Sequence, residues 1–333
     1  MENLILNQNY GMLYEEVYKG KCMIFEFKNS LGSVKHLFMK RKVPYQVEGI
    51  TYYDLITPFN YGGPVIEGCK EEDKWDLIND FQIEFQKYCQ ENNIVSEFIR
   101  FHPLLQNSMD FLHCYELDYL EDSKGINISR HNNTLTEELS VDCIEKVLEA
   151  FKSGVDYEIF TGKDTIDDFS RFITKVQGSK ENQSPQYFEG CKELLDDQLI
   201  FIEVKLEGEV VGMAMNIRTD KVLTTHLLVT DKIGDSLNAA YVLHFALAVW
   251  SRSNEVELIH LAGNWINKSE KENATFKNNF RVFTDYQYCI GRKIWNEEIY
   301  EELCDRAKVE RYIDYFPAYR VREKKLEDFL PMI

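Results

Sequence analysis

The stretch "LIFIEVKLEGEVVGMAMNIRTDKVLTTHLLV", residues 199–229, decides the fold. It consists of three apolar, β-branched runs that are separated by Gly208 and by the turn 218–220. Runs of this length between turn residues are typical of β-strands. Because each connection is only a few residues long, the strands are expected to pair with their neighbours as a meander. The expected strands are 199–206, 210–217 and 222–229.

Helices and strands alternate on both sides of this meander. The segment 237–251 is apolar all round, which indicates a helix buried against the sheet. The other expected elements are a helix at 142–153, a strand at 155–160, a helix at 165–175, a strand at 256–263, a helix at 269–280, a strand at 285–294 and a polar helix from Asn296.

The first 130 residues form a rougher version of the same pattern. Two strands, 21–28 and 34–43, are expected to make a hairpin, and strands follow at 94–104 and 113–120. Between them, 71–92 is expected to be an amphipathic helix, because apolar residues recur there at spacings of three and four. Those residues are Trp75, Ile78, Phe81, Phe85 and Tyr88.

The fold class is therefore α/β (α+β), with two domains that each contain a mixed sheet flanked by helices. We expect domain 1 at 1–135 and domain 2, with a C-terminal helical segment, at 136–333. The boundary rests on the change of pattern alone.

Charge and cysteine content limit the function classes. The chain has 333 residues and a net charge of −18, so it repels nucleic acid and anionic membranes at long range. A polyanionic ligand would need a local basic patch, for which 34–46 and 276–295 are the candidates. The eight cysteines form no C-x-x-C pair, and the start lacks a signal-peptide pattern. These features predict a cytoplasmic, soluble protein, and the histidine spacing indicates no metal site.

Several phrases point to one family. "YYDLITPFNYGGPV" (52–65) resembles the D-x-x-[TS]-P-[YF]-x-Y-G-G-P signature of the Fem-like, or BioF2-like, branch of the GNAT acyltransferase superfamily. The order of elements is also similar to that of the GNAT fold. Further phrases that resemble the branch are "FIRFHPLLQN" (98–107), "IHLAGN" (259–264), "ATFKNNF" (274–280) and "YCIGRKIWNEEIYEEL" (288–303).

This resemblance implies two tandem GNAT-like domains that transfer an acyl or aminoacyl group to an amine. The best-known members add amino acids from aminoacyl-tRNA to peptidoglycan precursors, and others are described only as acetyltransferase-like. The acyl donor implied is thus acyl-coenzyme A or aminoacyl-tRNA, without a metal. The acceptor implied is a small molecule or a cell-wall precursor, such as a sugar nucleotide or a peptide, bound on the domain 1 side.

Two departures from the family pattern leave an alternative open. The Arg/Lys-rich helix of the branch is replaced by "EKVLEAFKSGV" (145–155), in which only Lys146 and Lys152 are basic. The usual glycine-rich stretch is reduced to 262–264, and no coiled-coil arm is present. The alternative function is a non-catalytic sugar- or peptide-binding module that retains the scaffold but has a degraded donor site.

The catalytic candidates are Lys277, His226 and Asp54. In a helix, Phe276 and Phe280 lie one turn apart and share a face, so that they can bury together and direct Lys277 into a cleft. The resemblance implies that this lysine stabilises the acyl carbonyl; a solvated helix lysine is the other interpretation. His226, mid-strand, could accept a proton near neutral pH or be a hydrogen-bonded core histidine. Asp54 could accept a hydrogen bond from an amine.

The remaining candidates would bind the substrate or the donor. Pro58, Gly62, Gly63 and Pro64 predict a fixed loop with flat aromatic walls, which include Phe59; a packed structural loop is the alternative. The substrate-binding candidates are Tyr53, Tyr61, Gly62, Gly63, Arg100, His102 and Tyr288. The cofactor-binding candidates, implied by the GNAT donor strand and pyrophosphate loop, are Leu227, Val229, Lys232, Gly234 and Asn238. We expect one cleft lined by 51–65, His226 and Lys277.

Overall fold

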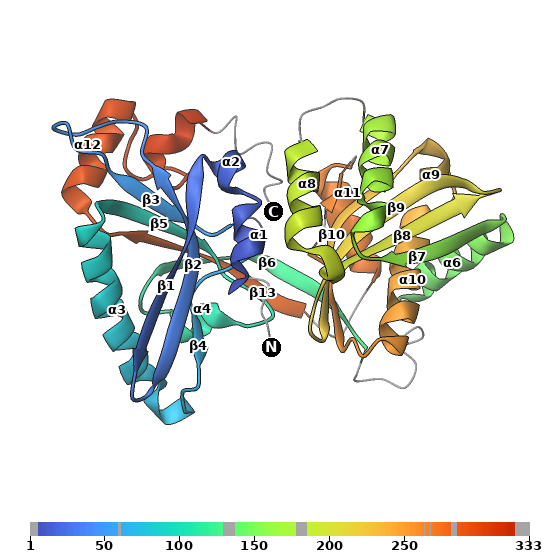
Figure 1. The fold of residues 1–333 in the computed structure, drawn as a ribbon, viewed down its shortest axis with the longest axis horizontal. Helices are drawn as coiled ribbons and strands as arrows, with labels where there is room; N and C mark the ends of the chain where they lie inside the picture. Colours follow the sequence, from blue (N-terminus) through green and yellow to red (C-terminus); the bar gives the residue numbers. More distant parts are fainter. Residues whose placement is uncertain are drawn as a thin grey trace. The chain divides into compact units, whose positions relative to one another are not determined.

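The computed structural model describes residues 6–58, 61–128, 137–177, 185–262, 264–266, 268–280 and 285–323. The chain divides into two compact units (Figure 1). Unit 1 contains Asp122–Tyr286, and unit 2 contains Leu4–Glu121 together with Gln287–Ile333. Each unit holds a mixed sheet flanked by helices, which confirms the expected fold class.

The sheet of unit 1 has the strand order β6-β11-β10-β9-β8-β7, and β12 also pairs with β10. The expected meander is present, because β8, β9 and β10 pair antiparallel in sequence order. β10 then pairs in parallel with β11 and β12. The bounds are β6 (Glu116–Asn127), β7 (Val155–Thr161), β8 (Leu199–Leu206), β9 (Glu209–Thr219), β10 (Val222–Thr230), β11 (Leu258–His260) and β12 (Asn264–Trp265).

Helices cover both faces of this sheet. Alternate residues of a strand point to opposite faces, so Ile200 and Ile202 join the core beneath α10, whereas Phe201 packs against Phe169 of α7. The apolar helix α10 thus lies buried, as its sequence predicts. The helices of unit 1 are α6 (Val141–Lys152), α7 (Ile166–Gln177), α8 (Pro185–Leu194), α9 (Lys232–Ser236), α10 (Ala239–Ser253) and α11 (Glu270–Asn279), with 3-10 turns η3 (Lys163–Thr165) and η4 (Asp196–Gln198).

The sheet of unit 2 has the order β1-β2-β3-β5-β13, with β4 paired to β2. β1 and β2 form the expected hairpin, and β3 runs parallel to β5. The bounds are β1 (Gly20–Asn29), β2 (Gly32–Lys42), β3 (Tyr53–Ile56), β4 (Val65–Glu67), β5 (Ile94–Arg100) and β13 (Asp285–Ile294). The helices are α1 (Gln8–Met12), α2 (Glu15–Tyr18), α3 (Lys74–Glu91), α4 (Asn107–Asp110) and α12 (Glu297–Ala307), with 3-10 turns η2 (Glu71–Asp73) and η5 (Ala318–Glu323).

The apolar stripe of α3 packs into the core of this unit. Ile78, Phe81 and Phe85 are buried as their spacing predicts, and Phe85 packs on Phe25 of β1. Trp75 is an exception, because 59% of it is exposed. It lies in the first turn of α3, where its ring stacks on His113 with 4.1 Å between the ring centroids.

The C-terminal segment belongs to unit 2, which differs from the expected boundaries. Tyr300 of α12 and Tyr319 of η5 are buried in a cluster with Val43 and Val95 of unit 2. Arg320 also forms an ion pair with Asp54 of β3. The described residues 287–323 therefore pack with the N-terminal part of the chain, within unit 2.

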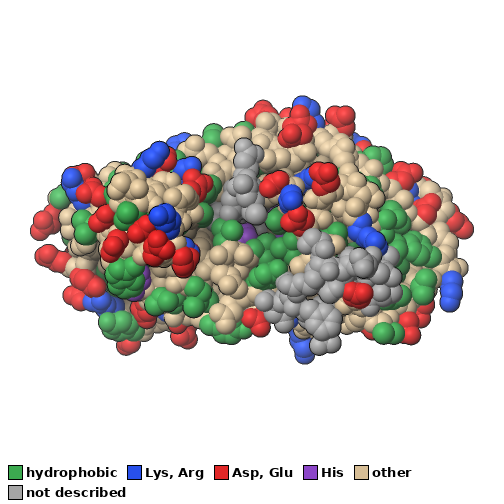
Figure 2. Space-filling view, turned by 90° about the horizontal axis from the view of Figure 1, so that it is seen from below, with side chains coloured by type: hydrophobic (Ala, Val, Ile, Leu, Met, Phe, Trp, Pro, Cys, Tyr) green, Lys and Arg blue, Asp and Glu red, His purple; other side chains and the backbone are tan. Residues whose placement is uncertain are grey.

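Charged side chains are distributed over the surface. On the face drawn in Figure 2, acidic side chains are interspersed with basic ones among the described residues. Within the described part of the chain, no helix is long and apolar enough to cross a membrane.

Candidate functional site

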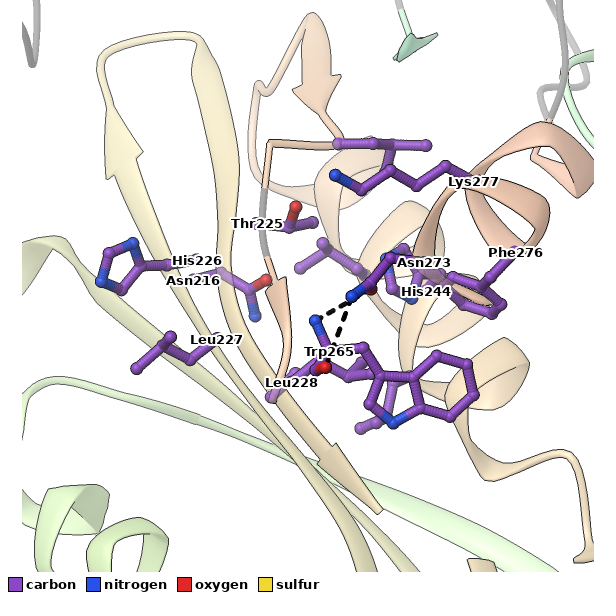
Figure 3. A pocket seen from close by; sticks show the side chains of 14 residues that line it. Asn216, Thr225, His226, Leu227, Leu228, His244, Trp265, Asn273, Phe276 and Lys277 are labelled. Carbon is purple, nitrogen blue, oxygen red and sulfur yellow. Dashed lines mark hydrogen bonds between the residues drawn. The ribbon is translucent and has the colours of Figure 1, made fainter. Parts of the chain in front are cut away.

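A narrow cavity in unit 1 lies between β10 and the helices α10 and α11 (Figure 3). Its volume is about 20 Å³, which is room for about one water molecule. Apolar side chains from the strands and from α10 and α11 supply more than half of the lining residues. The polar and charged side chains in the wall are Asn216, Thr225, His226, His244, Asn273 and Lys277.

An irregularity in β10 shapes the strand side of this cavity. Thr225 pairs with Asn216 of β9, and Leu227 pairs with the adjacent Met215, so His226 is an extra residue, as in a β-bulge. The parallel ladder changes partner at the same place, from β11 at Thr224 to β12 at Leu227. The pairing of β10 is therefore irregular at 225–226, the two residues by which this part of the strand lines the cavity.

Lys277 lies in the last turn of α11. A capping box at Ser269 and Glu272 fixes the start of this helix. Near its end, Phe276 and Phe280 are buried with 4.8 Å between their ring centroids, as their one-turn spacing predicts. Because these rings anchor the helix, the half-buried Lys277 is held at the wall of the cavity.

The imidazole of His226 does not face Lys277. Its Nε2 atom makes a short hydrogen bond with the hydroxyl of Tyr187, which belongs to α8. In Figure 3 the His226 side chain points to the other side of β10 from Lys277. Burial lowers the pKa of His226 to about 4. The structure thus favours the hydrogen-bonded core histidine over the expected base beside Lys277, because the bulge turns the ring toward α8.

A different histidine, His244 of α10, lies in the cavity wall with Lys277. Its Nδ1 atom is 3.0 Å from the carbonyl oxygen of Ala240, one turn earlier in the helix. The ring packs on Phe276 and Phe280. Burial, with a smaller contribution from the positive charge of Lys277, lowers the pKa of His244 to about 4. His244 is therefore a neutral hydrogen-bonding group at neutral pH.

Hydrogen bonds also fix the far end of the cavity. The side-chain oxygen of Asn273 accepts from the Trp265 backbone N–H at 3.0 Å, and the Asn273 amide donates back to the Trp265 carbonyl. The Trp265 indole N–H donates to Thr230 at 2.9 Å. These contacts join α11 to β10 through β12.

In the segment expected to bind donor phosphates, aspartate side chains of the segment itself occupy the start of its helix. Asp231 accepts a 2.8 Å hydrogen bond from the backbone N–H of Gly234 at the start of α9, and Asp235 forms an ion pair with Lys268 at 2.7 Å. A Cβ atom on Gly234 would lie 2.2 Å from the Val211 carbonyl oxygen, so this glycine serves the packing of α9 on β9. Two carboxylates thus occupy the place expected for a pyrophosphate.

The other cofactor candidates lie around this segment. Lys232 is exposed in the first turn of α9, and Asn238 has left-handed backbone angles between α9 and α10. The side chains of Leu227 and Val229 are buried in the sheet, and Leu227 lines the cavity.

In unit 2, Asp54 is fully buried in an ion-pair cluster. Its two carboxylate oxygens accept from Arg41 at 2.9 Å and from Arg320 at 2.5 Å. Tyr319 also donates to it, at 3.1 Å. Burial opposes ionisation, but the two guanidinium groups outweigh it and lower the pKa of Asp54. Since these partners occupy the carboxylate, Asp54 stabilises the fold and does not fit the expected role of receiving an amine.

The Gly-Gly loop is packed as a structural unit. The Asn107 amide donates to the carbonyl oxygens of Gly62 and Pro64, both at 3.0 Å. Gly63 has a φ of 89°, and a Cβ atom there would lie 3.0 Å from Phe101. There is no room for a side chain at Gly62 either, because an added Cβ atom would lie 2.8 Å from Thr57. The glycines are thus required by close packing within unit 2.

Tyr61, His102 and Tyr288 form one aromatic cluster beside this loop. Tyr61 meets the rings of His102 and Tyr288 edge-on, with centroids 5.6 Å and 5.2 Å away. All three are buried, and burial lowers the pKa of His102 to about 4. The structure brings these candidates together, but as an interior cluster.

Tyr53 and Arg100 are half-buried at the edge of the same region. Lys40 lies over the Tyr53 ring, 4.5 Å from its centroid, and the Arg100 guanidinium lies 5.1 Å from the centroid of Phe98. Phe59 of the predicted aromatic wall lies outside the described residues. Because Tyr61 belongs to unit 2 and Lys277 to unit 1, the shared cleft stays a prediction.

Among the described residues, no cluster of His, Cys, Asp and Glu side chains has the arrangement of a metal site. All eight cysteines are free thiols. The cavity itself offers Lys277 and the neutral imidazole of His244, together with the polar side chains of Asn216, Thr225 and Asn273.

Comparison with known proteins supports the fold. The chain is similar to the crystal structure of FemX, with a TM-score of 0.65 and 10% identity over 90% of this chain and 94% of that one. It is also similar to L-PGS from Bacillus licheniformis, with a TM-score of 0.52 and 12% identity over 92% and 98% of the two chains. The C-terminal domain of a putative lysylphosphatidylglycerol synthetase from Agrobacterium fabrum gives a TM-score of 0.52 and 12% identity over 86% and 89%.

No family model and no curated protein matches the chain. At identities this low, the structural likeness establishes the fold alone. The chain has the fold that FemX and the other two structures share, and the Fem-like GNAT branch that its sequence phrases resemble stays a prediction.

Sequence reasoning missed four residues that define these sites: Tyr187, Arg320, Asn107 and His244. Tyr187 of α8 directs His226, Arg320 of η5 neutralises Asp54, and Asn107 fixes the Gly-Gly loop. Each acts on a residue that is distant in sequence. Only His244 had a local signal, as a single histidine within an otherwise apolar helix.

Proposed function

We propose that the protein is an acyltransferase that moves an acyl or aminoacyl group to the amine of a small molecule or a cell-wall precursor. The reaction is assigned to the cavity of unit 1. The observation that carries this proposal is the position of Lys277, which α11 holds at a cavity opposite the interrupted edge of β10. This arrangement brings a cation to a cavity beside the irregular stretch of β10.

Acyl transfer to an amine develops negative charge on the carbonyl oxygen, and a positioned donor stabilises that charge. The Lys277 ammonium is such a donor. Two buried phenylalanines fix the helix turn that carries it, so little reorganisation is needed when the charge appears. Direct attack by the amine requires no nucleophilic side chain, and Lys277 therefore suffices as the electrophilic group.

We infer a small acyl donor in preference to aminoacyl-tRNA. Binding of tRNA depends on cations that neutralise many phosphates. In the two basic segments, Lys35 pairs with Glu67, Arg41 with Asp54 and Arg292 with Asp118, while Arg281 lies outside the described residues. The capped start of α9 also disfavours intact coenzyme A, so a donor without a bound pyrophosphate fits this chain best.

The acceptor is assigned to unit 2, where the half-buried Tyr53 and Arg100 supply an aromatic and a cationic group. With eight free cysteines, the protein is assigned to the cytoplasm, where thiols stay reduced.

The test is aminolysis of activated acyl donors by the purified chain. Acetyl and glycyl thioesters of N-acetylcysteamine, and alanyl esters of adenosine, would be offered with a panel of primary amines. The proposal expects amide formation above the uncatalysed rate, and a large loss in Lys277→Ala. Binding of tRNA below micromolar Kd with a steep salt dependence would contradict the small donor. Failure of every donor would contradict the enzyme.

One observation favours a second candidate, a binding module without catalysis. Because Asp231 and Asp235 occupy the donor-phosphate position, the donor site of the GNAT fold is altered. A module of this kind would bind a sugar or peptide and show no transfer. Native mass spectrometry of the purified protein distinguishes the two by the co-purified molecule: an acyl donor supports the enzyme, and a sugar or peptide alone supports the module.

A further inference from the structure

We propose that His244 accepts the proton of the attacking amine and returns it to the leaving group. This inference rests on the proposed acyl transfer and names the group that completes it. In place of His226, the candidate base of the sequence analysis, it names a histidine of α10 that shares the cavity wall with Lys277.

The tautomer of His244 follows from its contact with Ala240. A carbonyl oxygen can only accept, so the Nδ1 atom at 3.0 Å must carry the proton and donate it. The neutral ring then has its lone pair on Nε2. Within the described residues, Nε2 has no hydrogen-bond partner. It is also not one of the unpartnered polar atoms that are completely buried, so part of its surface is accessible. A ring that is 93% buried thus presents an acceptor to the cavity.

The surroundings of His244 keep that acceptor unprotonated. The charged group that faces it is Lys277 of α11, and the other titratable side chain in the cavity wall, His226 of β10, turns toward Tyr187. Leu243 and Leu247 of α10 and Phe276 of α11 contribute apolar wall. An apolar wall and a nearby cation both disfavour an imidazolium, so the pKa of His244 is about 4.

The step balances with an acyl ester or thioester as donor. The amine nitrogen forms a bond to the carbonyl carbon, and the carbonyl oxygen takes up negative charge beside Lys277. The attacking nitrogen has become positive and acidic, and it gives one proton to Nε2 of His244. When the carbonyl re-forms, the bond to the leaving oxygen or sulfur breaks, and His244 returns the proton to that atom. No oxidant, reductant or metal is consumed.

If His244 were purely structural, its roles would be to donate the hydrogen bond to Ala240 and to pack on Phe276 and Phe280. Two substitutions separate these roles. His244→Asn places an amide N–H close to the position of Nδ1 and removes Nε2. His244→Gln places an amide near Nε2, which can hydrogen-bond but cannot accept a proton at neutral pH.

Nuclear magnetic resonance of ¹⁵N-labelled histidine tests the geometry without a substrate. The His244 signals are assigned by their absence from the His244→Asn spectrum. The inference expects a protonated Nδ1 and an unprotonated Nε2 from pH 8 down to pH 5. A protonated Nε2 in this range would overturn it whether or not the chain is an acyltransferase.

Turnover with the N-acetylcysteamine thioesters and primary amines completes the test. Both variants should lose about 10²–10⁴-fold in kcat, the usual contribution of a general base. Free imidazole should restore part of the turnover of His244→Ala. Wild-type turnover in His244→Asn, or no rescue by imidazole, overturns the role of His244 and leaves the proposed function standing. No turnover in the wild type overturns both.

Discussion

Arg320, near the C-terminal end of the described chain, donates to the buried carboxylate of Asp54 with 2.5 Å between Nε and Oδ2. The same guanidinium donates to the Lys42 carbonyl oxygen, and Arg41 completes the cluster. This contact joins η5 to β2 and β3 and explains why residues 287–333 belong to unit 2.

Arg320→Ala should destabilise the protein by about 3–5 kcal/mol, because removing one partner of a buried ion pair leaves the other charge uncompensated. The measurement is the free energy of unfolding in urea. Arg322→Ala is the matched control, since this arginine is exposed two residues further along and should stay within about 0.5 kcal/mol of the wild type. Equal effects of the two substitutions would show that the cluster does not hold the segment.

Three buried histidines make stability depend on pH. His102, His226 and His244 each have a pKa near 4 in the folded chain, compared with about 6.5 when unfolded. The unfolded state therefore binds more protons between these values, so stability is complete above pH 6.5 and falls as pH drops toward 4.

Each histidine contributes about 1.4 kcal/mol to this loss for every unit by which its pKa is lowered. Thermal melting in buffers from pH 7 to pH 4.5 measures the effect. In His244→Gln, which cannot take up the proton, the melting temperature should depend less steeply on pH. An unchanged slope would mean that His244 is not held neutral by the fold.

Gly234→Ala should destabilise unit 1 strongly, because the new methyl group would lie 2.2 Å from the backbone oxygen of Val211, where no flexible side chain can yield. Gly208→Ala is the control. Its position has a φ of 84° but open space around the added Cβ atom, so the substitution costs only about 1–2 kcal/mol of backbone strain. A milder effect at Gly234 than at Gly208 would contradict the packing of α9 against β9.

Most of the fold could be predicted from the sequence because its periodic signals are local. The meander, the hairpin and the buried α10 arise from residues that are close together in the chain. Helix α8 was not predicted, since the sequence leading into it shows no periodic pattern of apolar residues. The placement of 287–333 was also missed, because the Asp54–Arg320 contact spans 266 positions and has no local signal.

The sequence predicts the candidate site only where residues one helix turn apart determine which side chains are buried. The sequence singles out Lys277 because Phe276 and Phe280 mark the buried face of α11. The direction of the His226 side chain could not be predicted, because a β-bulge changes the direction of side chains without any change in sequence pattern. The sequence of the aromatic loop shows its glycines but not why glycine is required there. That requirement comes from contacts with Asn107, Thr57 and Phe101.

The catalytic role of Lys277 is tested by measuring both kcat and the free energy of unfolding in Lys277→Ala and Phe276→Ala. If the Lys277 ammonium stabilises the developing oxyanion, Lys277→Ala should lower kcat by about 10²–10³-fold, or about 2.7–4 kcal/mol. Its free energy of unfolding should stay within about 0.5 kcal/mol of the wild type. Phe276→Ala should instead lose about 3–5 kcal/mol of stability, because it removes a buried ring. Unchanged kcat in Lys277→Ala, or equal destabilisation by both substitutions, would contradict the account.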